Sequence, residues 1–589
     1  MQRIGAAAGI DLAAHHPVPG TATAVDRPGA IRTDILILAA FAVLLCLPLL
    51  LTGIPRASDD GLFHVLAFRH FAEQLFAGHA YPRWLPDMNA GYGSPLFFYY
   101  APAAYYAAAL LSPVTFWTSD PWLEIGFAAW AAIAISGIAL YGWLRGATTR
   151  RAALAAAILY MVVPYHLAID TYVRGAYAEV WAFAWLPLVP AAVRARVGIA
   201  AVLAMAVAVA LLLTTHPPTA LLLAPFAAAY AAFESRRARS VKPLLGAVAG
   251  ATLGSALAAA YLMPALLLRD AVFADVMQWG MLNFRRWFLF DAAPDPPFKR
   301  QLTLMLTTMA GTILVAELVV RRAARAAAVR RFWVVAGAIA FVAMTAIALP
   351  LWEQLRVLQQ VQFPWRLGSV LSLALAAAVA HAVAAHTGSA EVPALVRFVY
   401  APGIALLWLA FTAQMMLPRQ APPWIQPMYD RDALPAVEYR PADSEFLWRT
   451  RTDDGRTLLP GAPRVTAVRG AGTASVLSWE SRRIELRTSA GGPMTLELRQ
   501  LHFTGWTARP LSGDTPIPTR ASPLGLLWID VPPGRHTLTL SLTRTAAERQ
   551  GSLVSIIAFL GAALLAVIEA LRRRRAAVRA VRADGERAG

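Results

Sequence analysis

The stretch DILILAAFAVLLCLPLLLTG, residues 34–53, has a charged side chain only at its first position and runs into the polar segment IPRASDDGLFH, residues 54–64. A helix needs about twenty mostly apolar residues to cross the hydrocarbon core of a bilayer. Comparable apolar runs recur along most of the 589-residue chain, which is 58% hydrophobic and 15% charged. Ordinary soluble domains are about 45–50% apolar and about 25% charged. The sequence therefore predicts a polytopic α-helical membrane protein.

The net charge of +18 is concentrated between the apolar runs, near residues 145–151, 194–196, 236–242, 321–331 and 572–575. Short basic loops mark the cytoplasmic side of a membrane protein. We therefore read the charge as a topological signal and expect no nucleic-acid partner. The single cysteine, Cys46, lies within the first apolar run, so an intramolecular disulfide is excluded.

The count of apolar runs conflicts with the charge pattern unless the run at 97–117 stays out of the membrane core. If residues 97–117 and 122–143 both crossed, the basic residues at 145–151 would lie outside. The first of these runs is rich in tyrosine and interrupted by Pro102, and tyrosine favours the membrane–water boundary. We therefore predict about twelve crossings with both termini cytoplasmic, and a first outer loop at 54–121 that contains a membrane-surface helix.

Residues 418–551 differ from the rest because they alternate apolar and polar side chains, as in Val465-Thr466-Ala467-Val468, between glycine- and proline-containing turns. We expect a β-sandwich-like domain outside the cytoplasm, followed by a final crossing. The predicted division of the chain is a cytoplasmic tail at 1–33, a transmembrane module at 34–417, the β-rich domain at 418–551, a last helix at 552–571 and a basic cytoplasmic tail at 572–589.

Asp59 and Asp60 stand at the predicted outer end of the first membrane helix, and His64 follows four residues after Asp60. Residues four apart share a face of a helix. A carboxylate at this place can act as a general base, or the pair can hold a divalent cation against a phosphate. The alternative is structural, because Ser58 or Asp59 can cap a helix that ends at Gly78.

Further polar residues gather on the same predicted side of the membrane. The irregular segment at 81–95 suits sugar binding or interfacial anchoring. Arginines at outer helix ends suit a lipid-linked phosphate, although an ion pair such as Arg174 with Glu179 is the structural alternative. Besides His64, the candidate substrate-binding residues are Arg83, Asp87, Asn89, Tyr92, His166, Arg174, Glu179, His216, Arg285, Arg286 and Arg366.

Several of these motifs resemble a bacterial family of membrane proteins labelled 6-pyruvoyl-tetrahydropterin synthase-related. The matching segments are Asp59-Asp60, Gly78-His79, Tyr81-Pro82-x-Trp84, Gly91-Tyr92-Gly93-x-Pro95, Tyr172-x-Arg174-Gly175, His216-Pro217 and Phe363-Pro364-Trp365-Arg366. The pterin enzyme of that label is a small soluble zinc protein, and no such zinc-site spacing occurs in this sequence. The broader resemblance is to GT-C glycosyltransferases, which carry an acidic residue early in the first outer loop and often a C-terminal outer domain.

The resemblance implies a GT-C-like fold and a transferase that moves a sugar from a polyprenyl-phosphate carrier to an extracytoplasmic glycan, lipid or protein acceptor. Asp59 or Asp60 would be the catalytic acidic residue. The protein would lie in the inner membrane of a bacterium. The residues identify no cofactor, although Asp59 and Asp60 could hold a divalent cation. Two alternatives remain open, a non-catalytic protein that assists surface-polysaccharide assembly and a transporter, which would place paired broken helices at the membrane midplane.

Overall fold

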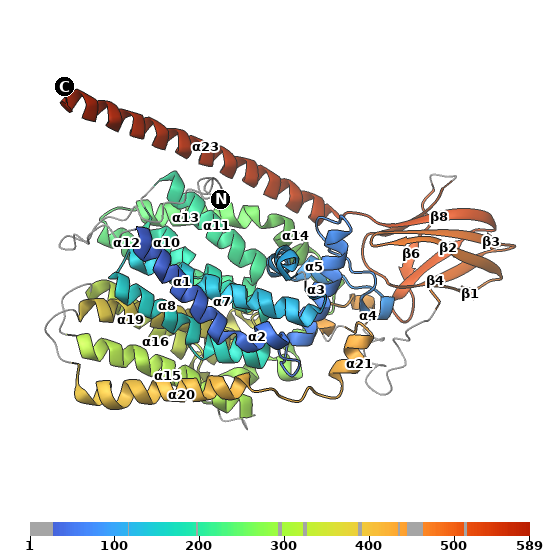
Figure 1. Cartoon of the computed structure of the whole chain (residues 1–589). Coiled ribbons are helices and arrows are strands. Elements are labelled where there is room, and N and C mark those ends of the chain that lie inside the picture. The colour runs from blue at the N-terminus through green and yellow to red at the C-terminus, as the bar shows by residue number, and fades with distance from the viewer. Residues whose placement is uncertain are drawn as a thin grey trace.

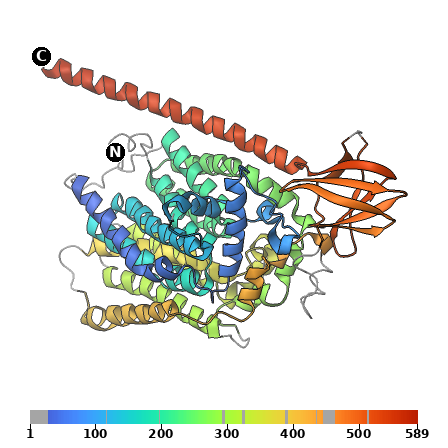
Figure 2. The same cartoon turned by 45° about the vertical axis from the view of Figure 1, so that its right-hand side comes forward.

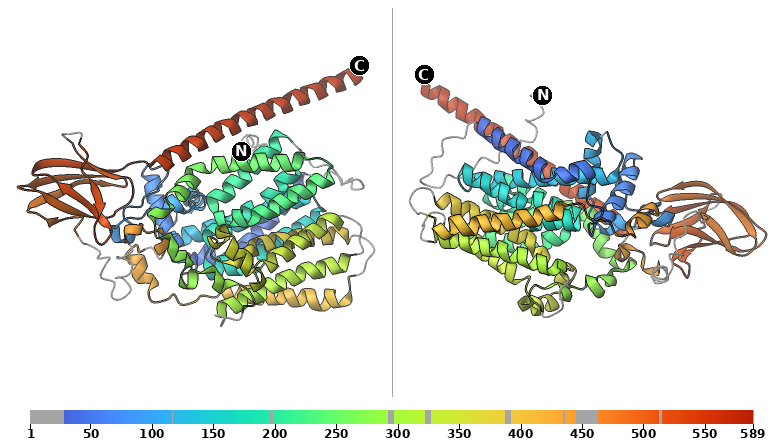
Figure 3. Two further views of the ribbon diagram at one scale, coloured as in Figure 1. Left: turned by 180° about the vertical axis from the view of Figure 1, so that it is seen from behind. Right: turned by 60° about the horizontal axis from the view of Figure 1, so that its bottom comes forward.

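The computed structural model describes residues 28–115, 117–195, 198–291, 297–321, 327–386, 392–433, 436–444, 463–511 and 515–588. Helices form an elongated body, and two β-sheets project from one of its ends, which we call the sheet end (Figure 1). The last helix, α23 (Ala546–Ala588), starts at the sheet end and runs back along the body towards the opposite end. The sheets stay at one end when the molecule is turned (Figure 2) and when it is seen from behind or below (Figure 3).

The body is built from helices of very different lengths. Two π-helical segments, η2 (Tyr165–Arg174) and η9 (Val396–Tyr400), and the 3-10 segments η8 (Pro364–Leu367) and η10 (Val437–Tyr439) interrupt or join the α-helices. The α-helices are α1 (Pro28–Leu45), α2 (Leu47–Thr52), α3 (Gly61–Phe76), α4 (Met88–Gly91), α5 (Leu96–Tyr99), α6 (Ala103–Leu111), α7 (Pro121–Arg145), α8 (Arg150–Val162), α9 (Tyr177–Trp185), α10 (Leu188–Arg194), α11 (Ile199–Thr215), α12 (Pro217–Arg237), α13 (Lys242–Leu257), α14 (Ala259–Leu267), α15 (Pro297–Val320), α16 (Ala327–Val342), α17 (Leu349–Gln354), α18 (Arg356–Gln359), α19 (Gly368–Ala385), α20 (Ala401–Met416) and α21 (Ile425–Asp430).

Among the described residues, six helical stretches are long and apolar enough to cross a membrane, or seven if the pair α13 and α14, bent by 71°, counts as one span. Length and composition therefore do not confirm the predicted number of about twelve crossings. The difference arises because several expected crossings are divided into shorter helices. The run at 34–53 breaks at Cys46, and the run at 177–193 breaks before α10, next to Pro187. Proline removes a backbone donor and interrupts a helix.

The run at 97–117 also consists of short pieces. Tyr100 has an extended backbone between α5 and α6, and α6 contains nine residues. At 1.5 Å per residue, a helix of that length covers roughly half of the hydrocarbon core of a bilayer. Neither α5 nor α6 can therefore cross a membrane as a single helix.

The C-terminal strands form two four-stranded antiparallel sheets, ordered β1-β4-β7-β6 and β2-β3-β8-β5. One apolar cluster contains side chains from both sheets, including Leu486 and Leu540 from one and Leu496 and Ile529 from the other. The strands are β1 (Val465–Arg469), β2 (Gly472–Glu480), β3 (Arg483–Ala490), β4 (Met494–Leu501), β5 (Trp506–Pro510), β6 (Thr519–Ala521), β7 (Leu526–Val531) and β8 (Gly534–Leu542).

The sheets are attached to the body through apolar packing as well as through charges. Trp84, from the segment that precedes α4, is fully buried in the cluster between the sheets and donates its indole N–H to Gln500 over 2.9 Å. Its ring lies 5.8 Å from that of Phe503 and 6.0 Å from that of Trp506. The segment around Trp84 is therefore part of the core of the β-region.

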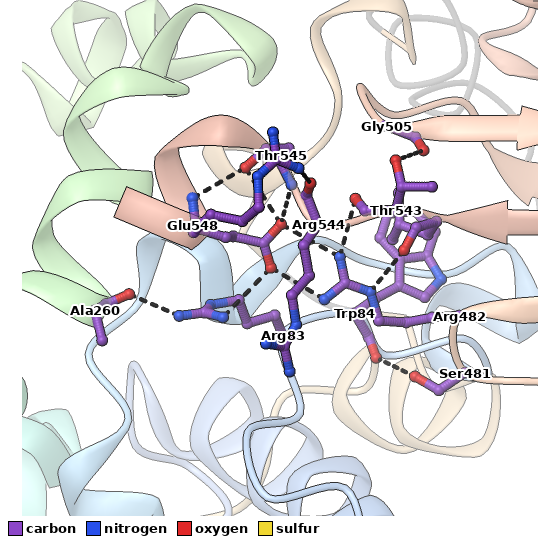
Figure 4. Close-up of polar contacts among 12 residues, drawn as sticks. Arg83, Trp84, Ala260, Ser481, Arg482, Gly505, Thr543, Arg544, Thr545 and Glu548 are labelled. Atoms are coloured by element: carbon purple, nitrogen blue, oxygen red, sulfur yellow. Dashed lines mark hydrogen bonds and ion pairs between the residues drawn. The ribbon is translucent and has the colours of Figure 1, made fainter. Parts of the chain in front are cut away.

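A buried carboxylate joins four parts of the chain at this junction (Figure 4). Glu548, in the first turn of α23, is fully buried and accepts hydrogen bonds from Arg83 over 3.3 Å and from Arg482 over 3.0 Å. Arg83 also donates to the carbonyl oxygen of Ala260 on α14 over 2.6 Å. Thr545 and Glu548 exchange backbone and side-chain hydrogen bonds in the pattern of a capping box. The start of α23, the β-region, the first loop and α14 are thus fastened together.

Candidate active site

The loop that carries Asp59 and Asp60 is held against the end of η2 by backbone hydrogen bonds. The amide of Asp59 donates to the carbonyl of Val173 over 3.2 Å, and that of Asp60 donates to the carbonyl of Arg174 over 2.6 Å. Gly175 has a φ of 63°, and a Cβ at this position would lie 2.6 Å from the hydroxyl oxygen of Ser58. A side chain at position 175 would therefore push the two segments apart, which accounts for the glycine after Arg174.

The segment η2 presents two charged residues to the interior of the protein. All ten of its residues are buried, including Asp170 and Arg174. The guanidinium of Arg174 bonds to Asp170 over 2.7 Å and to Glu179 over 2.8 Å, and it pairs with Asp60 at 3.4 Å. Its positive charge is therefore shared among three carboxylates, and it also stacks on the ring of Trp365, 4.7 Å from the centroid.

A second cation, Arg366, approaches the same cluster from η8. Its Nε lies 3.7 Å from a carboxylate oxygen of Glu179, and its Nη1 donates to the carbonyl of Val361 over 2.7 Å. Within the described residues, that Nε has no hydrogen-bond partner. The other oxygen of Glu179 accepts a hydrogen bond from Tyr165 over 2.8 Å. Arg366 is therefore less completely neutralised than Arg174.

Asp59 is an acidic residue of this cluster that solvent can reach. It is exposed, and the side chain of Asp60 is 43% exposed but tied to Arg174. Partial removal from water, together with the negative charge of Asp60, raises the pKa of Asp59 to about 6 against the opposing charges of Arg174 and Arg419. Such a carboxyl group is mostly ionised at neutral pH and is a better proton acceptor than an ordinary aspartate.

His64 lies one helical turn after Asp60 and is surrounded by aromatic rings. Its Nδ1 is 2.8 Å from the hydroxyl of Tyr105, and its ring is 5.8 Å from that of Tyr177 and 6.0 Å from that of Tyr100. Burial and the nearby Arg174 lower the pKa of His64 to about 3. The histidine is therefore neutral at physiological pH and shapes the site without adding charge.

His216, at the start of α12, is buried, and its Nδ1 lies 2.7 Å from the hydroxyl of Thr219. His166 is also buried, is stacked on Phe183 at 3.9 Å between centroids and has an Nε2 without a hydrogen-bond partner among the described residues. The structure thus joins Asp60, Arg174, Glu179 and Arg366 into one network of charges and holds Asp59 beside it through the backbone bond to Val173. The histidines lie in the surrounding core.

The predicted residues of the segment 81–95 have structural contacts instead. Arg83 belongs to the Glu548 junction. Asp87 is an exposed residue that precedes α4. Asn89 is buried and has a φ of 58°, and its backbone N–H donates to the carbonyl of Asp432 over 2.7 Å. Tyr92 packs in the cluster between the sheets, and its carbonyl accepts from Leu501 over 2.6 Å.

The paired arginines after α14 also have partners of their own. Arg285 forms an ion pair with Glu353 of α17 at 2.9 Å, in which both side chains are largely exposed. Arg286 contacts the sulfur of Met281 at 3.7 Å. Each is therefore engaged with residues other than Asp59, Asp60 and Arg174.

Sequence reasoning missed the segment around Glu438. The ring of Tyr439 lies 6.2 Å from that of Phe63 and 5.7 Å from that of Tyr100, which brings η10 to the rim of the site. Burial and the charge of Asp60 raise the pKa of Glu438 to about 7. Arg419 was missed as well, although its guanidinium donates to the carbonyl of Tyr172 over 2.7 Å. The one available signal was the charged and aromatic triplet Glu438-Tyr439-Arg440 in a linker.

The described part of the chain holds no group of three or more histidine, cysteine or acidic side chains arranged to bind a metal ion. Asp59 and Asp60 remain the pair that could hold a divalent cation together with oxygens of a substrate, since Mg²⁺ is often bound by one or two carboxylates plus phosphate.

Comparison with known proteins gives a family match and similarities to solved structures. Residues 97–413 match a family described as "6-pyruvoyl-tetrahydropterin synthase related domain; membrane protein". A search of curated proteins found no significant match. Among solved structures, the arabinofuranosyltransferase AftD from Mycobacteria is 19% identical with a TM-score of 0.43, over 67% of this chain and 27% of that one. The archaeal oligosaccharyltransferase AglB from Archaeoglobus fulgidus was solved with an inhibitory peptide and a dolichol-phosphate. It is 14% identical with a TM-score of 0.38, over 72% of this chain and 58% of that one. This chain thus spans about a quarter of the length of AftD.

Proposed function

The chain belongs to the 6-pyruvoyl-tetrahydropterin synthase-related family of membrane proteins, and we propose that it is an inverting glycosyltransferase that takes a sugar from a polyprenyl-phosphate carrier. The acceptor would be a glycan, lipid or protein outside the cytoplasm. The observation that carries this proposal is the exposed Asp59, with its pKa raised to about 6, beside a network that contains two arginines.

Asp59 would act as the general base. An acceptor hydroxyl group would lose its proton to the Asp59 carboxylate while its oxygen forms a bond to the anomeric carbon of the sugar. The bond between that carbon and the phosphate oxygen would break, and its electron pair would leave with the phosphate. Asp60 would orient this region through Arg174, because its carboxylate is already paired with that guanidinium.

Arg366 is the arginine best suited to stabilise the leaving phosphate. Three carboxylates share Arg174, whereas Arg366 has one carboxylate contact, at 3.7 Å, and an Nε without a hydrogen bond among the described residues. A guanidinium binds phosphate oxygens in a bidentate manner when its donors are free to do so. Arg285 and Arg286 would have to leave their present partners to take this role.

The proposal includes a membrane arrangement. Asp59 would face the extracytoplasmic side of a bacterial inner membrane, with both termini in the cytoplasm and about twelve crossings. Residues 54–121 would form the outer loop, and residues 418–551 would form a β-sandwich-like outer domain that recognises the acceptor. The basic segments between the helices and after residue 571 support this orientation.

A double variant, Asp59→Asn with Asp60→Asn, tests the proposal in cells that produce the full-length protein at the wild-type level. We expect loss of the sugar that the protein adds to the cell surface, measured by mass spectrometry of the envelope glycans. Asp270→Asn, an exposed aspartate after α14, is the matched control. A normal glycan profile in the double variant would refute catalysis by these acids. Loss of function only after deletion of residues 418–551 would favour the non-catalytic alternative.

A further inference from the structure

A long apolar cavity lies at the edge of the helical body. It has a volume of about 840 Å³ and is lined by side chains from α1, α8, η2, α15, α19, η9 and α20, among them Leu45, Leu167, Thr312 and Met416. The exposed side chains of Leu44 and Leu409 flank it, and α20 lies on the outside of the body (Figure 3). The cavity therefore opens at the surface of the helical body, on a side that would face the bilayer in the proposed membrane arrangement.

Two lining residues of this cavity, Leu45 and Met416, connect it to neighbours of Asp59. The hydroxyl of Tyr172 donates to the carbonyl of Leu45, a lining residue, over 2.8 Å. The carbonyl of Tyr172 accepts from Arg419, three residues beyond the lining residue Met416. The next residue, Val173, accepts the backbone hydrogen bond of Asp59. A hydrocarbon chain in the cavity would therefore bring its polar end to Arg419 and Asp59.

A second apolar cavity, of about 620 Å³, approaches the same network from other helices. It is lined by side chains of α10 to α14 and of the segment around Val361, and it shares no lining residue with the first. Pro217, one of its residues, follows His216, and Val361 holds the guanidinium of Arg366 through its carbonyl. The first cavity is thus connected to Asp59 through Tyr172 and Val173, and the second is connected to Arg366 through Val361.

The chemistry of inversion assigns the two cavities to different substrates. In an inverting transfer, the attacking oxygen and the leaving oxygen lie on opposite faces of the sugar ring. The base and the phosphate-binding arginine therefore receive the acceptor and the donor from different sides. An acceptor that enters beside Asp59 has an apolar cavity behind it, which a wholly water-soluble glycan would leave unused.

We propose that the acceptor is itself a lipid: a hydroxyl-bearing head group on a hydrocarbon chain, with that chain in the cavity between α1 and α20. The polyprenyl chain of the donor occupies the cavity beside Arg366. This inference rests on the proposed glycosyl transfer and narrows its acceptor from any extracytoplasmic molecule to an amphiphile anchored in the membrane.

Photolabelling of the full-length protein in phosphatidylglycerol nanodiscs tests the assignment. The acceptor probe is dodecyl glucoside with a diazirine in its alkyl chain, and the donor probe is farnesyl phosphate with the same group. We expect the glucoside to label peptides of α15 and α20, and an excess of unlabelled dodecyl glucoside, but not of farnesyl phosphate, to reduce this labelling about tenfold. Farnesyl phosphate should label peptides of α12 and α13.

Two matched substitutions sharpen the test, because each adds the same bulk to a half-buried lining alanine. Ala316→Phe narrows the first cavity and should reduce labelling by the glucoside alone, whereas Ala251→Phe narrows the second and should reduce labelling by farnesyl phosphate alone. Displacement of the glucoside label by farnesyl phosphate would overturn the assignment, as would labelling that no excess of glucoside displaces, which marks bulk lipid.

The labelling is also measured in the double variant Asp59→Asn, Asp60→Asn, since occupation of the cavity requires no transfer. Competed labelling that persists there, with a normal surface glycan, would refute the proposed catalysis and not the amphiphile site. If the wild-type protein shows no labelling that excess dodecyl glucoside reduces, this inference is refuted. The glycosyl transfer is then still decided by its own test.

Discussion

Two clusters of charged residues, one around Glu548 and one around Arg174, differ in how their carboxylates are bonded. Both oxygens of Glu548 accept hydrogen bonds, from two arginines and from the helix cap at Thr545. Around Arg174, one oxygen of the buried Asp170 has no partner among the described residues, and Asp59 is exposed. A bonded carboxylate holds segments together, whereas an accessible one can accept a proton.

The largest effect is expected when Asp59 is replaced by asparagine. Removal of a general base typically costs a factor of about 10²–10⁴ in rate, so Asp59→Asn should lower transfer by that factor. The measurement is incorporation of labelled sugar into membrane vesicles that contain the full-length protein. Asp60→Asn should cost less, because Asp60 is paired with Arg174 and is not the proposed base. A smaller loss for Asp59→Asn than for Asp60→Asn would reverse the assigned roles.

The Glu548 cluster should respond through stability. Glu548→Ala leaves Arg83, which is 6% exposed, without its carboxylate, and removal of one partner of a buried ion pair costs about 3–5 kcal/mol. We expect a lower Tm for the detergent-solubilised protein. Glu569→Ala, which breaks the exposed pair with Arg573 on the same helix, should cost less than about 1 kcal/mol. Equal shifts in Tm would show that the buried ion pairs of Glu548 stabilise the protein no more than the exposed pair does.

The raised pKa of Asp59 predicts how transfer depends on pH. The base must be ionised, so with a pKa of about 6 the rate should fall about tenfold per unit as the pH drops below that value. Asp60→Asn removes a negative charge that raises this pKa and should move the acidic limb to lower pH. Rate profiles of the wild-type protein and of Asp60→Asn check this, and an unmoved limb would argue against coupling between the two acids.

The smallest effect is expected from the exposed arginines. Arg285→Gln breaks a pair in which both side chains are largely exposed, and such pairs contribute roughly 0–1 kcal/mol. Transfer should therefore change by no more than about threefold, while Arg366→Gln should lower kcat/KM by at least tenfold, as expected for loss of a charge-assisted phosphate contact. Comparable losses in the two variants would return Arg285 to the list of phosphate-binding candidates.

The sequence predicted the coarse organisation because hydrophobicity and strand alternation are local properties. The apolar runs became helices, and the alternation at Val465–Val468 became β1. The breaks were harder to foresee because proline is no certain mark of one. A proline lies at the start of α2 and another precedes α10, but Pro225 and Pro264 lie inside α12 and α14. The number of crossings, the domain limits and the membrane-surface role of residues 97–117 stay predictions.

The candidate site was partly foreseen for the same reason. Arg174 and Glu179 are five residues apart, so their pairing could be anticipated, and the structure contains it. The partner of Arg83 is 465 residues away in sequence, and no local pattern links the two. Glu438 and Arg419 reach the site only because the linker after α20 folds back over it, which is a property of the tertiary structure.

The placement of Arg174 depends on the π-helical winding of η2. A π-helical turn is wider than an α-helical one, and each residue of an α-helix advances by about 100° around the axis. If these ten residues wound as an ordinary α-helix of the same length, Arg174 would be rotated away from Glu179 and Asp60. A protein with every charged group retained would then lack the arrangement on which the proposed chemistry depends.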